Sequence, residues 1–314
     1  MLYPLKSNMP EEPSNFLTTR QLARLWSVSE ATIKRWADAG HLRMSRTVGG
    51  HRRFSLAEVA RFQAERGLGA SARRADVPGG ATDAAPPAEE AGAELPPHDL
   101  NDEAEHLAER FFQAIREGRE GASAALLLSG FLRRAEPAPL FDEAVMPALR
   151  RVGDLWHAGE MSVAEEHLAT LAATRAVQTL AAAARRERPG APTAAVCAAE
   201  DEFHQLPVLC AQAVLEAEGW QVKNLGPHTP FFALADHVER HAPALACVSS
   251  TTTAGLERGL RDYARLLEVA RERGTLLVLG GQGFAGEGIR RQFPADLHAE
   301  SFVRLAEFVR GLGL

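Results

Sequence analysis

The sequence contains no apolar run close to the roughly 20 residues that a membrane-spanning helix needs. Its first residues, MLYPLKSNMPEEPSN, lack the basic and then apolar pattern of a secretory signal peptide. Cysteine is scarce, with only Cys197, Cys210 and Cys247. Their number is odd, they lie among apolar residues, and no two of them have the spacing of metal ligands. These absences exclude a disulfide scaffold and a zinc module. They predict a soluble, cytoplasmic protein without a membrane partner, whose thiols are buried and reduced.

Charge is unevenly distributed along the 314 residues, although the net charge is only −6. Residues 14–74 hold twelve Lys/Arg and four Asp/Glu, a net charge of +8, whereas residues 75–109 hold ten Asp/Glu and no Lys/Arg. A chain of this length predicts two or three domains. The local excess of positive charge makes the N-terminal part a candidate for binding nucleic acid.

Composition and periodicity divide the chain into four regions. Residues 75–100 are rich in Pro, Ala, Gly and acidic residues, which predicts a flexible acidic linker. Residues 101–188 repeat apolar positions every three or four residues in four segments, which predicts a four-helix bundle. Residues 192–314 alternate short apolar runs with helical segments, which predicts parallel strands covered on both faces in a Rossmann-like, flavodoxin-like domain. With residues 15–74 as a winged helix-turn-helix domain, the fold class is multidomain α and α/β.

The basic region divides into two short helices and a wing. TRQLARLW and EATIKRWADAG flank the turn SVS, where Ser29 is an expected N-cap, so the pair forms a helix-turn-helix. HLRMSRTVGGHRRFS predicts a basic hairpin that turns at Gly49-Gly50. We expect DNA contacts from both elements; the alternative is a basic module that binds protein. The candidate residues are Thr32, Lys34 and Arg35 on the second helix, and Arg46, His51, Arg52 and Arg53 on the wing. This segment resembles the MerR family in a shortened, excisionase-like form.

Polar or Gly-rich loops follow all four expected strands: EDEFH, GPHTP, SSTTT and GGQGF. Ligands of parallel α/β sheets bind outside the carboxyl ends of the strands, so these loops predict a site. Glu202 and His204 lie in the first loop, Ser249 and Thr251 in the third, and Gly280-Gly281 in the fourth. Imidazole is a good ligand for transition metals, and a carboxylate two residues away can fix its tautomer.

These loops, with 41 residues between Pro207 and Ser249 and 28 between Thr251 and Gly280, resemble a cobalamin-binding signature. That signature reads Asp/Glu-x-His-x-x-Gly, then Ser-x-Leu or Ser-x-Thr, then Gly-Gly. The resemblance implies that His204 is the lower cobalt ligand and that the small residues at the other strand ends make room for the nucleotide tail. Pro207 stands where the signature has glycine, and its side chain could crowd the corrin or shift the loop.

The helical region adds the spacing Trp156-x9-Glu166-His167, in which Trp156 ends the third helix and Glu166-His167 open the fourth. With LWHAGEMSVAEEHLA, LGPHTP and LGGQG, the chain resembles the CarH/LitR-type light-sensing transcriptional repressors. The resemblance implies adenosylcobalamin as chromophore, with Trp156 against the adenosyl group and Glu166 on its ribose. It also implies that His167 becomes a cobalt ligand after photolysis, and that a dark homotetramer on operator DNA dissociates in light.

Two other functions are compatible with these motifs. Pro207 favours a DNA-binding regulator that senses cobalamin without using light. A corrinoid methyl carrier would share the helical and cobalamin-binding parts, but the basic helix-turn-helix argues against it. We therefore expect a regulator rather than an enzyme, and a linker that lets the DNA-binding modules of one assembly reach separate half-sites.

Overall fold

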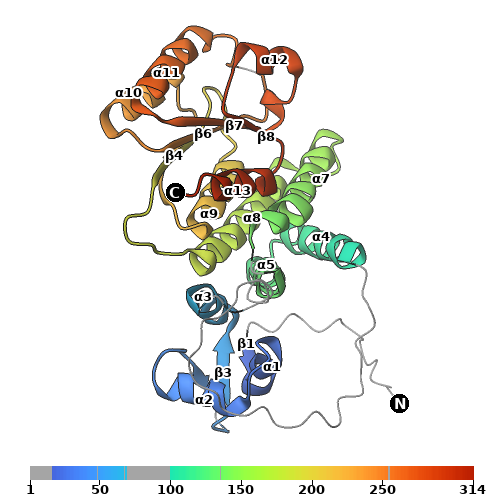
Figure 1. The fold of residues 1–314 in the computed structure, drawn as a ribbon. Coiled ribbons are helices and arrows are strands. Elements are labelled where there is room, and N and C mark those ends of the chain that lie inside the picture. Colours follow the sequence, from blue (N-terminus) through green and yellow to red (C-terminus); the bar gives the residue numbers. More distant parts are fainter. Residues whose placement is uncertain (1–15, 48, 67, 69–99, 135, 254) are drawn as a thin grey trace.

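The computed structural model describes residues 16–314 except 48, 67, 69–99, 135 and 254. The predicted acidic linker lies outside the described residues apart from Leu100, where the first helix of the helical part begins. Figure 1 shows the small N-terminal domain at one end, the helical part in the middle and the α/β part at the other end. None of the helices in the described part of the chain is long and apolar enough to cross a membrane.

The N-terminal domain combines a helix-turn-helix with a three-stranded antiparallel sheet of order β1-β3-β2. Ser29 caps α2 as predicted, because its hydroxyl accepts the Thr32 N–H at 3.1 Å. The wing strands β2 and β3 also form, while β1 and α3 are additional elements that the sequence analysis did not resolve. The elements are β1 (Phe16–Thr18), α1 (Thr19–Leu25), α2 (Glu30–Asp38), β2 (Ser45–Arg46), β3 (Arg52–Ser55) and α3 (Leu56–Arg66).

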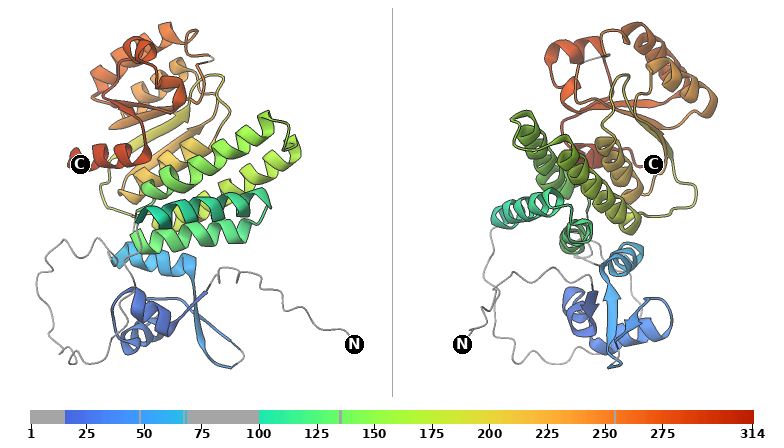
Figure 2. Two further views of the ribbon diagram at one scale, coloured as in Figure 1. Left: turned by 90° about the vertical axis from the view of Figure 1, so that its right-hand side faces the viewer. Right: turned by 180° about the vertical axis from the view of Figure 1, so that it is seen from behind.

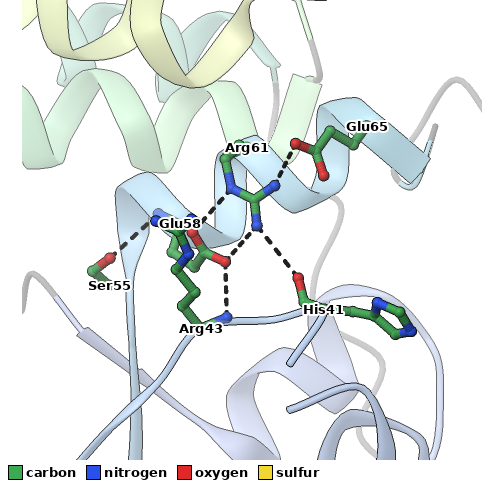
Figure 3. A network of polar contacts seen from close by, with 6 residues as sticks. All are labelled: His41, Arg43, Ser55, Glu58, Arg61 and Glu65. Carbon is green, nitrogen blue, oxygen red and sulfur yellow. Dashed lines mark hydrogen bonds and ion pairs between the residues drawn. The ribbon is translucent and has the colours of Figure 1, made fainter. Parts of the chain in front are cut away.

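A network around Glu58 joins α3 to the segment that leads into the wing (Figure 3). The Glu58 carboxylate accepts the Arg43 backbone N–H at 2.8 Å and Arg61 Nε at 3.0 Å. Arg61 also donates to the His41 carbonyl oxygen at 3.3 Å. Burial by itself would raise the pKa of Glu58, but these hydrogen bonds outweigh burial and lower it. The segment that leads into the wing is therefore held against α3, the helix that faces the helical part.

The helix-turn-helix domain packs directly on the helical part through α3 (Figure 2), which contacts α5 and α8. Gln63 on α3, 1% exposed, bridges the two domains. Its amide oxygen accepts Trp26 Nε1–H at 2.8 Å, and its amide nitrogen donates to the Leu132 carbonyl oxygen of α5 at 3.1 Å. One continuous apolar core runs through both domains. The two domains are therefore joined by packing, a contact that the sequence analysis did not foresee.

The helical part contains four long helical segments, as the periodicity predicts, but the third segment is interrupted. Residues 141–145 form a π-helical turn, η2, between α6 and α7. Such turns often occur at functional sites. The segments are α4 (Leu100–Arg116), α5 (Glu120–Arg134), α6–η2–α7 (Ala138–Leu140, Phe141–Val145, Met146–His157) and α8 (Val163–Ala184). A short turn joins α7 to α8, so Trp156 at the end of one helix lies near Glu166 at the start of the next.

The α/β part is built on a parallel sheet of order β5-β4-β6-β7-β8. The four predicted strands are present, and β8 is a fifth that sequence periodicity missed because it has three residues. Two apolar clusters cover opposite faces of the sheet, one with α9 and α13, the other with α10 and α11. The elements are β4 (Thr193–Ala198), α9 (Leu206–Ala217), β5 (Gln221–Gly226), α10 (Phe231–His241), β6 (Leu245–Ser249), α11 (Leu260–Arg273), β7 (Leu276–Gly280), η3 (Gln282–Phe284), α12 (Glu287–Gln292), β8 (Leu297–Ala299) and α13 (Phe302–Gly311).

The three cysteines are free and buried, as predicted. Burial raises the pKa of the Cys197 thiol to about 12, so it stays protonated and unreactive.

Candidate functional site

A cavity of about 840 Å³ lies between the helical part and the carboxyl edge of the sheet. Its volume falls at the upper end of the range for cofactor and ligand sites. Helices α7 and α8 supply one wall, and the ends of β4, β6 and β7 supply the opposite wall. Eight of the nine predicted cofactor-binding residues line it: Trp156, Glu166, His167, His204, Ser249, Thr251, Gly280 and Gly281. The ninth, Glu202, lies beneath His204, where it is 2% exposed.

His204 is held in a fixed orientation by the buried carboxylate of Glu202. Glu202 Oε1 lies 2.5 Å from His204 Nδ1 and accepts the His204 backbone N–H at 2.9 Å. The His204 side chain is 69% exposed and lines the cavity. With Nδ1 engaged by the carboxylate, Nε2 is the ring nitrogen left for a ligand in the cavity.

Thr251, on the loop after β6, completes the support of Glu202. Its backbone N–H and its hydroxyl both donate to Glu202 Oε2 at 2.5 Å. Burial alone would raise the pKa of Glu202, but hydrogen bonds from His204 and Thr251 lower it to about 2. The hydrogen bond that the His204 ring donates to the Glu202 carboxylate raises the pKa of His204, and the charge of Glu166 adds to that effect from the helical side.

The end of β7 approaches the neighbouring loop too closely for a side chain. Gly281 has a positive φ of 93°, and a β-carbon there would collide with the carbonyl oxygen of Ser250. Gly280 and Gly281 line the cavity together with Ser249 and Thr251, so this part of the sheet edge presents only small residues to a ligand. Pro207 lies in the first turn of α9, where proline is favoured, and also lines the cavity.

The helical wall presents three predicted side chains with different exposure. Trp156 is 43% exposed, and it lines the cavity. The Glu166 carboxylate accepts a hydrogen bond from Thr170 Oγ1 at 2.8 Å, which orients it. The His167 side chain is 73% exposed, and its Nε2 lies 3.6 Å from Glu166 Oε2.

Sequence reasoning missed several residues of the cavity wall. Thr170 and Thr174 follow Glu166 on the same face of α8, a helical spacing that could have identified them. Phe203 lines the cavity and stacks on His228 at a ring-centroid distance of 5.2 Å. Both residues lie in loops at the predicted edge of the sheet. Asp142 comes from η2 and carries no sequence signal at all.

The predicted DNA-contacting residues differ in how free their side chains are. Lys34 and Arg35 on α2, and Arg46 and His51 on the wing, are exposed. The Thr32 hydroxyl instead lies 2.9 Å from Ser29 Oγ, within the capping turn.

Two wing arginines make contacts inside the domain. Arg52 pairs with Asp38 of α2 at 2.6 Å, and its side chain is 18% exposed. Arg53 is half-buried and donates to the Arg52 carbonyl oxygen at 3.1 Å. Arg52 therefore ties the wing to the second helix in the structure.

Two segments of the chain match known protein families. Residues 16–67 match the helix-turn-helix domain family, and residues 107–181 match the B12 binding domain family. The HTH-type transcriptional repressor CarA of Myxococcus xanthus is 26% identical over 277 residues, covering 85% of this chain and 87% of CarA. The repressor CarH of the same organism is 31% identical over 157 residues, which span 49% of this chain and about half of CarH.

A solved structure supports the fold of the two C-terminal parts. The monomethylamine corrinoid protein of Methanosarcina barkeri superposes with a TM-score of 0.55 at 18% identity, covering 66% of this chain and 98% of that protein. An identity this low speaks for the fold alone. The chain thus combines a helix-turn-helix domain with a cobalamin-binding domain, and it is a distant homologue of the CarA/CarH-type HTH transcriptional repressors.

Proposed function

We propose that the protein is a light-responsive transcriptional repressor that uses adenosylcobalamin as its chromophore and has no enzymatic activity. The observation that carries the proposal is the arrangement of the cavity. A histidine with one ring nitrogen held by a buried carboxylate faces a large apolar side chain and a second histidine across it. In this arrangement His204 would hold a cobalamin from the sheet edge, while Trp156 and His167 would cover it from the helical wall.

The residues of the sheet edge fit the lower face of a cobalamin. His204 Nε2 would bind cobalt, Glu202 would hold the tautomer, and the small residues Ser249, Thr251, Gly280 and Gly281 would make room for the nucleotide tail. Glu202 is a permanent anion because its pKa is about 2, so the Nδ1 proton of His204 keeps an acceptor throughout the physiological pH range.

The helical wall would take the upper face. Trp156 presents an exposed ring to pack against the adenosyl group, and the Glu166 carboxylate, oriented by Thr170, can accept hydrogen bonds from ribose hydroxyls. When bound, adenosylcobalamin supplies a cobalt–carbon bond that light breaks. His167 is exposed on the same wall and would be free to ligate the vacated position, while Trp156 loses its packing partner.

DNA binding would follow assembly. A single helix-turn-helix reads a short site, so most of the operator affinity would come from several modules bound together in a dark tetramer. Thr32, Lys34, Arg35, Arg46, His51, Arg52 and Arg53 are the proposed DNA-facing set. A ligand present at a thousand times its dissociation constant, and bound only to the assembled state, contributes about 4 kcal/mol to assembly.

A regulator of this kind acts where its operator DNA is, so the predicted cytoplasmic location remains part of the proposal.

The test combines light scattering with a gel shift on the same sample. Protein with adenosylcobalamin should form a larger, DNA-binding species in darkness, and green light should reverse both properties. Protein with hydroxocobalamin, which lacks the adenosyl group, serves as the matched control and should remain small in both conditions. Equal mass and equal DNA affinity in darkness and in light would refute the photoreceptor.

A second candidate is a regulator that senses cobalamin without using light. Pro207 favours it, because its ring lines the cavity where the signature has no side chain. This candidate predicts a red protein whose absorption spectrum, mass and DNA affinity are indifferent to illumination.

A further inference from the structure

Asp142 joins the two walls of the cavity. It lies in η2, at the start of the continuous rod that runs through α7 to Trp156, and its carboxylate reaches across to the N-terminus of α13. Oδ1 accepts the Phe302 N–H at 2.9 Å, and Oδ2 accepts the Val303 N–H at 2.9 Å. Asp142 and Phe302 line the cavity, and 160 positions separate them in the sequence.

Both N–H groups need a partner from outside their helix. The first N–H groups of a helix have no acceptor within it, and the N-terminal end carries partial positive charge. Ser301 satisfies the Arg304 N–H at 3.1 Å as an ordinary N-cap, while Asp142 serves the two N–H groups before it. A carboxylate in this position is therefore bound by charge as well as by geometry.

An aromatic contact beside the Asp142 carboxylate reinforces its hydrogen bonds to α13. The rings of Phe141 and Phe302 meet edge to face at a centroid distance of 5.7 Å. Burial raises the pKa of Asp142 although its N–H donors oppose that shift, which indicates a site withdrawn from water. Burial, and then the nearby Asp142 charge, raises the pKa of the Cys210 thiol on α9.

The contact lies on a mechanical path between the two ligand-facing sets. On one side, Asp142 precedes Trp156 by 14 positions on one helical rod, a separation of roughly 21 Å at 1.5 Å per residue. On the other side, α13 packs on α9, which begins directly after the His204 loop. Figure 1 shows α13 between the sheet and the helical part, next to α9. The two walls also meet where α8, which carries Glu166, packs on α9, and where α6 packs on α13.

We propose that Asp142 is a positioning residue that clamps the rod of α7 to the N-terminus of α13 and so sets the separation between Trp156 and His204. This inference rests on the proposed cobalamin function, since the separation matters only for a ligand that touches both walls. A cobalamin with a large upper group needs that separation, whereas one with a small upper group is held by the sheet edge alone.

The experiment uses the full chain with Asp142→Asn, which keeps the shape but can offer an acceptor to only one of the two N–H groups. Glu143→Gln is the matched control, because Glu143 pairs with Arg134 on the outer side of the same turn. Asp142→Glu keeps the charge and serves as the second variant should Asp142→Asn fail to fold.

Two measurements are made on each variant. Hydrogen exchange of the ligand-free protein should be about tenfold faster at the Phe302 and Val303 amides in Asp142→Asn, and unchanged in Glu143→Gln. Titration should show adenosylcobalamin affinity reduced about tenfold in Asp142→Asn, with hydroxocobalamin affinity retained. Asp142→Glu should keep the amide protection and recover part of the adenosylcobalamin affinity.

The outcomes separate the clamp from the proposed function. Unchanged exchange at Phe302 and Val303 overturns the clamp. Faster exchange with both affinities unchanged, or with both reduced equally, overturns the positioning role, because a purely structural residue does not discriminate between the two cobalamins. Wild-type protein that binds neither cobalamin overturns the proposed function itself, whatever the exchange rates are.

Discussion

Glu202→Gln tests how the chain prepares His204 for a metal. The substitution keeps the shape of the side chain but replaces one acceptor oxygen with an NH₂ donor. In the wild type, Oε1 serves the backbone N–H and Nδ1 of His204, and Oε2 serves the N–H and hydroxyl of Thr251. The glutamine must therefore turn its NH₂ toward one of these two pairs of groups.

The structure indicates which arrangement costs less. The Thr251 hydroxyl can rotate and accept a hydrogen bond from NH₂, whereas neither His204 group facing Oε1 can accept from it without a change of tautomer. The favoured arrangement leaves the Thr251 N–H without an acceptor, which costs about 1–3 kcal/mol for a buried donor. The bond to His204 Nδ1 survives but loses its ionic partner, and charge-assisted bonds are about twice as strong as neutral ones.

We expect two results from this variant. Native-state hydrogen exchange of the β4 and β6 amides should report a loss of about 1–3 kcal/mol in local stability. Hydroxocobalamin titration, followed by absorbance, should show affinity lower by about 10–100-fold, the usual effect of losing the partner of a metal-binding histidine. Glu268→Gln, on the exposed face of α11, is the control and should change neither quantity. Wild-type hydroxocobalamin affinity in Glu202→Gln would refute the idea that the carboxylate prepares His204 as a ligand.

Four further variants test other parts of the structure. Trp156→Ala should retain hydroxocobalamin binding but lose dark assembly with adenosylcobalamin in light scattering; equal dark assembly would remove Trp156 as the sensor of the upper group. Arg35→Ala should weaken operator binding by about 1–3 kcal/mol if it reads a base, without altering cofactor uptake, and wild-type operator affinity in a gel shift would contradict its place in the interface. Glu58→Gln should destabilise the N-terminal domain by about 1–3 kcal/mol at pH 7. Because the pKa of Glu58 is lowered in the folded state, this difference should be present above its ordinary pKa and vanish as pH falls through the lowered one; a difference that does not change with pH in denaturation would refute it. Gln63→Leu strands the Trp26 N–H and the Leu132 carbonyl, so α3 should exchange faster with solvent and be cleaved sooner by protease, and unchanged protection would show that the domain contact does not depend on this bridge.

Local patterns in the sequence predicted most of the elements and most of the candidate site. The helix-turn-helix, the four helical segments and four strands follow from apolar periodicity and capping residues, which act over a few positions. The cavity residues of the sheet edge were predictable as well, because the carboxyl ends of parallel strands meet at one edge and each carries a short polar loop. The spacing of Trp156 and Glu166 placed them on adjacent helix ends for the same local reason.

Contacts between distant segments were decided only by the tertiary structure. The hydrogen bonds of Glu202 with Thr251, of Gln63 with Leu132 and of Asp142 with Phe302 join residues 49, 69 and 160 positions apart. No periodicity encodes such pairs, because each depends on how whole helices and strands pack and on which polar groups that packing removes from water. The short strand β8, the π-turn η2 and the docking of α3 have the same origin, since packing around them outweighs their weak local preferences. The residue sequence therefore determined which chemistry is present, and the packing of distant elements determined how those groups are held.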